Sequence, residues 1–279
     1  MITALDDPRL ELARKTVGAI RIVPDPTLPP RLLRLVDTRG QAYLAKQHTR
    51  HDRYAQEAQA YLMWQQLLRG YTAQLIGRQD STYTLLFTAL PGDCAAAVEH
   101  DTAEEERAHH AAGLVLGTFH RATSMGTSNA IGSELAQRLR SWTAKADQAD
   151  LISTSERRWL LHSATRLADS SMDSSICHLD YQPRNWLVAA GRFWICDFEH
   201  TRRDARVRDF ARLEYRRWQA MPHLREAFFD GYGAQLTGTE QQLLELFGAI
   251  EAATALVRGH EQDDIALRAH GGSVLSRLK

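Results

Sequence analysis

The sequence predicts an α+β protein with two lobes: a small β-rich N-terminal lobe of residues 1–90 and a larger, mostly α-helical C-terminal lobe of residues 91–279. Short apolar runs separated by turn residues fill the first part, as in an antiparallel sheet. Long runs of helix-forming residues fill the second part. A Pro-Gly turn at residues 91–92 marks the boundary between the two lobes.

The N-terminal lobe is expected to begin with a short helix and three strands, the last two joined as a hairpin by the turn residues 37–40. A helix that ends before Gly70 and a further strand complete it. The helices are expected at residues 9–15 and 53–68, and the strands at 19–23, 31–36, 41–47 and in 83–93.

The C-terminal lobe is expected to be helical at residues 102–123, 133–146 and 155–169 and in several segments after residue 205. Its exception is the stretch from Ile176 to Phe198. Here WLVA and RFWICDF flank Ala190 and Gly191, a pattern that predicts two short strands joined by a tight turn.

The composition is that of an ordinary globular protein. The 34 basic and 34 acidic residues balance, so no net charge attracts a nucleic acid or an anionic membrane, and we expect neither partner. The chain has no apolar run of membrane-spanning length and no hydrophobic signal segment at its start. Its three scattered cysteines indicate reduced thiols, so a cytoplasmic location is expected. The oligomeric state is not indicated.

Four polar residues, His178, Asp180, Asn185 and Asp197, lie at the edges of apolar segments. Each alone is typical of a cap, a turn or a structural histidine. Together they predict convergence, because Asp180 and Asn185 are five positions apart and the following hairpin returns Asp197 beside them. Such oxygen donors suit Mg²⁺ and phosphoryl transfer. A metallohydrolase with His178 and Asp180 as ligands is disfavoured, since no second histidine pair lies near at ligand spacing.

The pattern HxDxxxxN followed by DFE resembles the aminoglycoside phosphotransferase and choline kinase family, whose members are relatives of the eukaryotic protein kinases. The resemblance spans most of the chain and implies a two-lobed protein-kinase-like fold with ATP or GTP as donor. It assigns Asp180 as the catalytic base, His178 as an organiser of the loop, and Asn185 and Asp197 as Mg²⁺ ligands. The family's usual glycine after the histidine is Leu179 here.

The first lobe offers an independent test, because a kinase needs a lysine on a strand and a glutamate on the next helix. Lys46 shares a strand face with Ala42 and Leu44, and Glu57 lies on the apolar face of the following helix. A surface lysine of an edge strand is an equally good reading of Lys46 alone. An ion pair between Lys46 and Glu57 would resolve two costly burials and would leave the ammonium group positioned for phosphates.

The strand ending in LLFTALPGD resembles the family's hinge, so Thr88, Ala89 and Leu90 are candidates for binding the nucleotide base through their backbone. His120 fits a helix of the core, and Asp209 resembles a family aspartate that braces the catalytic loop; we expect both to be structural. The loop of residues 24–31 departs from the family, because it has four prolines and no glycine. Either Lys46 and Mg²⁺ carry more of the phosphate binding, or residues 38–40 form the clamp.

The acceptor is expected to be a small molecule with a hydroxyl group, near acids that family members use for cationic antibiotics. Candidates are Glu199, Glu261, Asp263 and Asp264, although arginines after Glu199 also suit an anionic or neutral acceptor. The sequence thus predicts a small-molecule kinase for an antibiotic-like or sugar-containing acceptor, with a role in antibiotic resistance as one possibility. The alternatives are a metabolic kinase of a sugar, amino alcohol or glycated amine, and a non-catalytic nucleotide-binding module.

Overall fold

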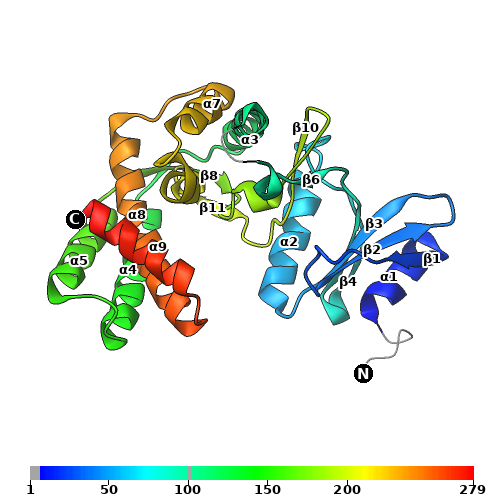
Figure 1. The fold of residues 1–279 in the computed structure, drawn as a ribbon, viewed down its shortest axis with the longest axis horizontal. Coiled ribbons are helices and arrows are strands. Elements are labelled where there is room, and N and C mark those ends of the chain that lie inside the picture. The colour runs from blue at the N-terminus through cyan, green and yellow to red at the C-terminus, as the bar shows by residue number, and fades with distance from the viewer. Residues whose placement is uncertain (1–6, 100–101) are drawn as a thin grey trace. The chain divides into compact units, whose positions relative to one another are not determined.

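The computed structural model describes residues 7–99 and 102–279, whose elements are shown in Figure 1. The chain forms two compact units. The N-terminal unit contains the described residues up to Ala108 together with Gln182–Arg202, and the C-terminal unit contains His109–Tyr181 and Arg203–Lys279. The first is rich in strands and the second is mostly helical, which confirms the predicted fold class. In the described residues, no helix is long and apolar enough to cross a membrane.

An antiparallel sheet in the order β1-β2-β3-β5-β4 is the centre of the N-terminal unit. The predicted hairpin is present, and Asp37 holds its turn by accepting hydrogen bonds from the amides of Arg39 and Gln41 at 2.8 and 2.9 Å. Strand β4 was not predicted, because Gly77 and Arg78 interrupt its apolar pattern. The strands are β1 (Ile20–Val23), β2 (Leu32–Asp37), β3 (Ala42–Gln47), β4 (Leu75–Gln79) and β5 (Thr84–Thr88).

Helix α1 (Pro8–Val17) supplies the apolar layer on this sheet. Asp7 caps the helix by accepting from the amide of Arg9 at 2.9 Å, and Pro8 occupies the first turn, where its missing amide donor costs nothing. Removal of these apolar side chains from water stabilises the unit by roughly 1.5–3 kcal/mol for each fully buried leucine. The core cluster comprises Leu10, Leu12 and Ala13 of the helix with Leu35, Tyr43, Ala45 and Leu86 of the sheet.

Helix α2 (His51–Trp64) follows β3 and ends four residues before the predicted end at Leu68. Glu57 and Tyr61 are buried on one face, four residues apart. The ring of Tyr61 packs against Phe87 of β5 and against Phe198, with ring centroids 4.6 and 5.1 Å apart. This aromatic contact fixes the helix against the sheet and directs Glu57, one turn earlier, towards the end of β3.

A second small sheet in the order β10-β9-β6 belongs to the N-terminal unit. Strands β9 (Trp186–Ala189) and β10 (Arg192–Ile195) form the predicted hairpin, and β9 also pairs with β6 (Asp93–Cys94). Gly92 allows this pairing, because a Cβ atom there would lie 2.5 Å from the carbonyl oxygen of Val188. The division therefore differs from the predicted boundary at residue 90: the pairing joins Gln182–Arg202 to the first unit.

The C-terminal unit combines helices with a sheet in the order β11-β8-β7. Helix α8, orange in Figure 1, contacts α4, α5 and α9. Helices α3 and α7 approach closely at Gly113, where a Cβ atom would lie 1.9 Å from the carbonyl oxygen of Phe228. The elements are α3 (Ala103–Ala122, which begins in the first unit), β7 (Thr127–Ser128), α4 (Ala130–Gln148), α5 (Thr154–Ala168), β8 (Met172–Cys177), β11 (Arg202–Ala205), α6 (Arg208–Leu213), a π-helix (Glu214–Trp218), α7 (Pro222–Tyr232), α8 (Gly238–Glu261) and α9 (Ile265–Leu278).

Candidate functional site

Lys46 is a buried cation on β3 and lies among three acidic side chains. Its Nζ atom is 2.6 Å from Glu57 Oε2, 2.6 Å from Asp197 Oδ1 and 3.3 Å from Glu199 Oε2. The expected ion pair with Glu57 is therefore present. The lysine side chain is only 6% exposed, so it belongs to this cluster and is not a surface lysine of the strand.

His48 also belongs to the cluster, although it is not among the residues predicted from the sequence. Its Nε2 is 2.8 Å from Glu57 Oε2, and its Nδ1 is 3.8 Å from Glu199 Oε2. One imidazole and two carboxylates are a set of residue types that can bind a metal ion. Here the same carboxylate oxygens already contact the ammonium group of Lys46, so a positive charge occupies the centre of the set.

The electrostatics of the cluster favour charged forms of Lys46 and Glu57. Burial opposes protonation of Lys46, but the charges of Glu57, Asp197 and Glu199 outweigh it and raise the pKa of the lysine. Burial likewise opposes ionisation of Glu57, but the charge of Lys46 and the hydrogen bond with His48 lower the pKa of this carboxyl group. The result is a desolvated ion-pair network.

Arg31 is the second cation of the cluster and comes from the end of the proline-rich loop. Its Nη1 donates to Glu199 Oε2 at 2.8 Å, and its Nη2 donates to Asp197 Oδ2 at 3.3 Å. The side chain is 40% exposed, in contrast to Lys46. Sequence reasoning missed Arg31, because the departure of this loop from the family was judged from its missing glycine and not from the basic residue that follows the prolines.

Asn185 and Asp197 are neighbours through the backbone of the hairpin. Trp186 pairs with Ile195, and the amide of Cys196 donates to the carbonyl oxygen of Asn185 at 3.0 Å. The hairpin thus returns Asp197 beside Asn185, as predicted. Asp197 has a φ of 66°, an unusual left-handed backbone for a residue other than glycine. Such local strain is typical of functional positions.

His178 and Asp180 lie in the C-terminal unit, directly after β8. Asp209 of α6 holds this loop: it accepts from the amides of His178 and Leu179 at 2.8 and 2.5 Å. Leu179 has a φ of 62°, which explains the family's glycine at this position. The expectation that Asp209 braces the loop agrees with these hydrogen bonds.

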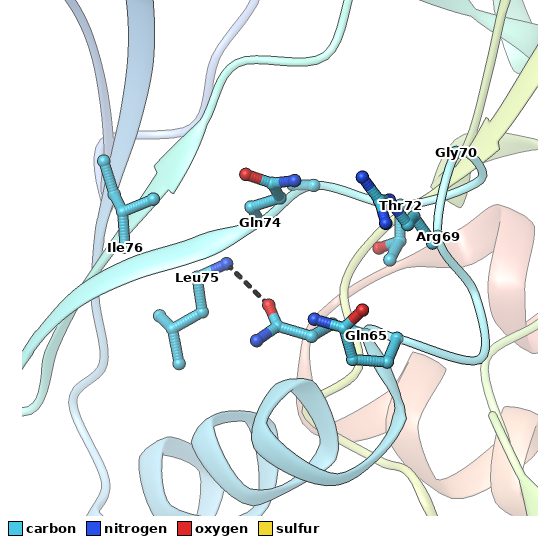
Figure 2. Close-up of a pocket in the computed structure, with 9 residues that line it drawn as sticks. Gln65, Arg69, Gly70, Thr72, Gln74, Leu75 and Ile76 are labelled. Atoms are coloured by element: carbon cyan, nitrogen blue, oxygen red, sulfur yellow. Dashed lines mark hydrogen bonds between the residues drawn. The ribbon is translucent and has the colours of Figure 1, made fainter.

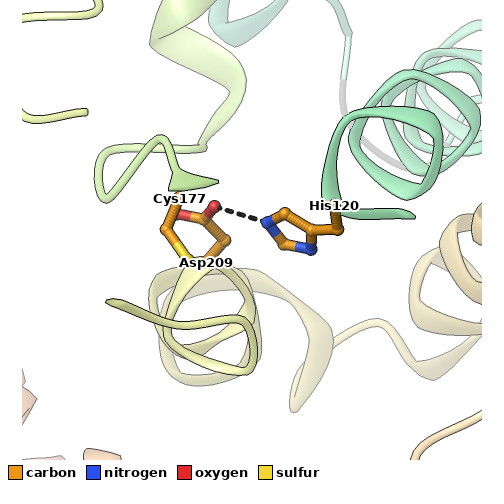
Figure 3. Close-up of side chains that lie close together, drawn as sticks. All are labelled: His120, Cys177 and Asp209. Carbon is orange, nitrogen blue, oxygen red and sulfur yellow. Dashed lines mark hydrogen bonds and ion pairs between the residues drawn. The ribbon is translucent and has the colours of Figure 1, made fainter. Parts of the chain in front are cut away.

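Figure 3 shows the third partner of Asp209, the imidazole of His120 on α3. His120 Nε2 is 3.0 Å from Asp209 Oδ2, and its Nδ1 is 3.0 Å from the hydroxyl of Tyr232. Burial raises the pKa of the nearby Cys177 thiol well above its usual value, and the charge of Asp209 adds to this effect. A neutral thiol is a poor metal ligand. We therefore assign His120, Cys177 and Asp209 to the structure of the loop.

Asp180, the predicted base, is buried and contacts a guanidinium group. Its carboxylate oxygen Oδ1 is paired with Nη1 of Arg212 on α6. The Asp180 side chain is 2% exposed and that of Arg212 is 24% exposed. Burial lowers the pKa of Arg212 to about 10, which leaves it protonated at neutral pH. No sequence pattern singles out Arg212, which is one of many arginines in that region.

The three predicted hinge residues differ in what their backbones can offer. The amide of Thr88 donates to the carbonyl of Gln74, and the amide of Ala89 donates to the carbonyl of Ala42, each at 3.0 Å. Among residues 7–99 and 102–279, the amide of Leu90 has no such backbone acceptor. Leu90 is therefore the best placed of the three to donate to a nucleotide base.

The four acids predicted for the acceptor are divided between the two units. Glu199 lies in the Lys46 cluster of the N-terminal unit, and the other three lie in the C-terminal unit. Glu261 pairs with Lys145 at 3.6 Å. Asp264 caps α9 by accepting from the amide of Leu267 at 2.9 Å, and Asp263 has a left-handed φ of 52° in the turn before it. Their role towards an acceptor stays a prediction.

A separate cavity of about 270 Å³ lies between the end of α2 and β4 (Figure 2). Gln65 Oε1 closes one side by accepting from the amide of Leu75 at 3.1 Å. None of the residues predicted for the site lines this cavity. Its lining includes Gln65, Gln66, Arg69, Thr72 and Gln74.

A strand lysine paired with a helix glutamate, together with the Asn185 and Asp197 hairpin, defines the class of phosphotransferases with a kinase-like fold. The sequence of residues 28–246 matches the phosphotransferase enzyme family (APH). This match covers more than half of the chain, so the chain belongs to that family and is a phosphotransferase. The predicted resemblance is confirmed.

Solved structures with the same fold have low sequence identity to the chain. The gentamicin complex of APH(2")-IIa has a TM-score of 0.66 at 12% identity, covering 95% of this chain and 93% of that one. The GDP complex of wild-type aminoglycoside 2'-phosphotransferase-IIIa has 0.67 at 13%, covering 98% of each. Macrolide 2'-phosphotransferase MphH from Brachybacterium faecium has 0.64 at 17%, covering 95% and 96%. A search of curated proteins finds no match.

Proposed function

We propose that the protein is a small-molecule kinase, which transfers the γ-phosphate of a nucleoside triphosphate to a hydroxyl group of a sugar-containing or antibiotic-like acceptor. The observation that carries this proposal is the buried cluster in which Lys46 contacts both Glu57 and Asp197 at 2.6 Å. Structures of the same fold are named as complexes with GDP and with streptomycin and ATP, which supports a nucleotide donor.

The residues fit a magnesium ion. Asn185 and Asp197 offer oxygen donors from neighbouring positions on the hairpin. Around Lys46, three carboxylates face the two cations Lys46 and Arg31, so the cluster has acidic charge to spare for a further cation. When bound, Mg²⁺ would neutralise charge on the transferring phosphate.

In the proposed reaction, Lys46 binds the phosphates of the donor and the backbone at Leu90 receives the base. Asp180 orients the acceptor hydroxyl and accepts its proton as the hydroxyl oxygen forms a bond to the γ-phosphorus. The bond between the γ-phosphorus and the bridging oxygen breaks, and the nucleoside diphosphate leaves. His178 and Asp209 hold the loop that carries Asp180.

Arg31 supplies donors for phosphate that the proline-rich loop lacks. Prolines have no amide hydrogen, so residues 24–31 offer few backbone donors. A guanidinium group binds phosphate oxygens in pairs. Arg31 lies 3.3 Å from Asp197 and is partly exposed, so it can move from the carboxylates to a nucleotide phosphate.

The experiment compares Asp180→Asn with Asp173→Asn, an exposed carboxylate on β8. Labelled ATP and GTP are offered with Mg²⁺ and a panel of sugars, aminoglycosides and macrolides. Asp180→Asn is expected to lower transfer by about 10²-fold or more with nucleotide affinity, measured by thermal shift, within about twofold. Asp173→Asn should resemble the wild type. Wild-type transfer by Asp180→Asn would refute the assignment of Asp180 as the base. Mg²⁺-dependent nucleotide binding without transfer to any acceptor of the panel would favour the non-catalytic module.

A further inference from the structure

The immediate neighbour of Asp180 in the C-terminal unit is a cation. Arg212 contacts the Asp180 carboxylate, and about a quarter of its side chain is accessible. A hydroxyl that donates to Asp180 must approach within about 3 Å of the same carboxylate. The atoms of the acceptor next to that hydroxyl therefore lie within reach of the guanidinium group of Arg212.

The charges behind Arg212 are also predominantly positive. Arg216 and Arg258 lie near enough to lower the pKa of Arg212, an effect that adds to that of burial. Glu251, which raises the pKa of Arg212, already accepts from Arg216 Nε at 2.7 Å and lies 3.3 Å from His270 Nε2. Apart from Asp180 itself, the charges described around Arg212 therefore offer little for binding an amino group of an acceptor.

Two acids that would suit a cationic acceptor, Glu261 and Asp264, have other partners in this unit. Glu261 pairs with Lys145, whose ammonium group lies 4.8 Å from the ring centre of Trp142. The guanidinium group of Arg258 lies 5.9 Å from the centre of the same ring. The surface formed by α4 and the end of α8 therefore presents two cations on one aromatic side chain.

We propose that Arg212 is a binding residue for the acceptor, and that the acceptor carries a carboxylate or phosphate group close to the hydroxyl that is phosphorylated. This inference rests on the proposed function. A guanidinium group binds either anion in a paired geometry. Binding of the anion would draw Arg212 away from Asp180 and leave the carboxylate to accept the hydroxyl proton. The enzyme is thus selective against polycationic acceptors.

The test uses four probes that share one sugar ring and differ in charge: glucose, glucosamine, glucuronate and glucose 1-phosphate. Transfer from labelled nucleotide and binding by thermal shift with a non-hydrolysable nucleotide are measured for each. The wild type is expected to respond more strongly to the two anionic probes than to glucose, and least to glucosamine. The comparison of glucuronate with glucose 1-phosphate separates a carboxylate from a phosphate. Equal responses, including no response to any probe, or a preference for glucosamine would overturn the proposal.

Variants locate the selectivity at one residue. Arg212→Gln should raise KM for the preferred anionic probe about 10- to 100-fold, because a hydrogen bond between charged groups is lost, with KM for the nucleotide within about twofold. Arg212→Lys keeps the charge and should lose less of the preference. Arg225→Gln is the control, since Arg225 is similarly exposed and pairs with Glu214 at 3.2 Å in the same unit.

The outcomes separate this inference from the proposed function. Nucleotide binding and slow nucleotide hydrolysis without acceptor report on the kinase function alone. If both persist while Arg212→Gln leaves the ranking of the probes unchanged, the proposed function stands and the acceptor assignment is wrong. A rise in nucleotide KM in Arg212→Gln, with acceptor KM unchanged, would place Arg212 on the donor phosphates and would also overturn the assignment.

Discussion

Each unit contains one of two buried ionic clusters that differ in composition. Hydrogen-bond donors outnumber carboxylates in the cluster of the C-terminal unit, and carboxylates outnumber cations in that of the N-terminal unit. In the C-terminal unit, Asp209 is fully buried and receives two backbone amides and His120. In the N-terminal unit, Lys46 contacts Glu57, Asp197 and Glu199. Arg31 contacts the last two, which remain 20% and 14% exposed.

The difference separates support from binding. A buried carboxylate whose partners are all protein groups gains nothing from a ligand and holds a loop in place. A cluster with more carboxylates than cations, open to solvent at one side, can accept a metal ion and exchange its arginine for a phosphate. Perturbed pKa values occur in both clusters, so the balance and access of the charges, and not the perturbation itself, distinguish the candidate binding site.

The largest effect on stability is expected from Asp209→Ala. It leaves the amides of His178 and Leu179 and the imidazole of His120 without their common partner, at a cost of about 3–5 kcal/mol in the free energy of unfolding. Urea unfolding measures this loss. The control is Asp230→Ala, whose carboxylate is 80% exposed beside His110 and should change stability by less than about 0.5 kcal/mol. Equal effects of the two substitutions would contradict the bracing role.

The next largest expected effect is a loss of stability in acid, which depends on Glu251. Burial raises the pKa of this carboxyl group, but the hydrogen bond with His270 and the charges of Arg216 and Arg212 outweigh it and lower the pKa to about 2. A lowered folded-state pKa stabilises the protein above the unfolded value of 4.5, and this contribution disappears as the pH falls towards 2. The whole contribution is about 3 kcal/mol.

The free energy of unfolding, measured between pH 5 and pH 2.5, should therefore fall less steeply for Glu251→Gln than for the wild type as the pH is lowered. Glu245→Gln, on the exposed side of the same helix, is the matched control and should keep the wild-type slope. A wild-type slope in Glu251→Gln would show that the folded protein does not favour the charged form of this carboxyl group. Like Asp209, Glu251 is a buried acid that is already paired with protein groups.

Much of the fold could be predicted because the deciding signals are local. The hairpins at residues 37–40 and 190–191 follow from turn residues between apolar runs, and the long helices follow from their periodicity. Strand β4 was missed because its apolar pattern is broken. The membership of Gln182–Arg202 in the first unit was missed because the pairing of β6 with β9 joins segments more than ninety residues apart, and no local pattern reports such pairing.

The candidate site shows the same limit. Lys46, Glu57, Asn185 and Asp197 could be named because their spacing fits a family pattern and their positions on strands and helices are local properties. Arg31 and Arg212 could not be named, because each becomes informative only through a contact with an acid far along the chain. For Arg31 the sequence holds one further signal, a basic residue at the end of a glycine-free loop.

Arg31→Gln tests the exchange in the N-terminal cluster. Loss of a partly exposed cation should raise KM for the nucleotide about tenfold and change kcat little, since the interaction is made in the bound ground state as well. Steady-state kinetics with Mg²⁺ and either nucleotide measure the change. Arg34→Gln is the control, because Arg34 is 33% exposed and pairs with Asp25 at 3.1 Å. An unchanged nucleotide KM in Arg31→Gln would leave the phosphates to Lys46 and residues 38–40.

The smallest effect is expected from Glu261→Gln, which removes an acid once predicted for a cationic acceptor. Glu261 and Lys145 are half exposed and 3.6 Å apart, so their pair should contribute less than about 0.5 kcal/mol. KM for the acceptor should stay within about twofold, because the proposed acceptor is held by Arg212. Kinetics with the preferred probe and thermal unfolding measure both quantities. A severalfold rise in acceptor KM would instead assign Glu261 to acceptor binding. The C-terminal unit would then also contain an acid that is able to bind a ligand.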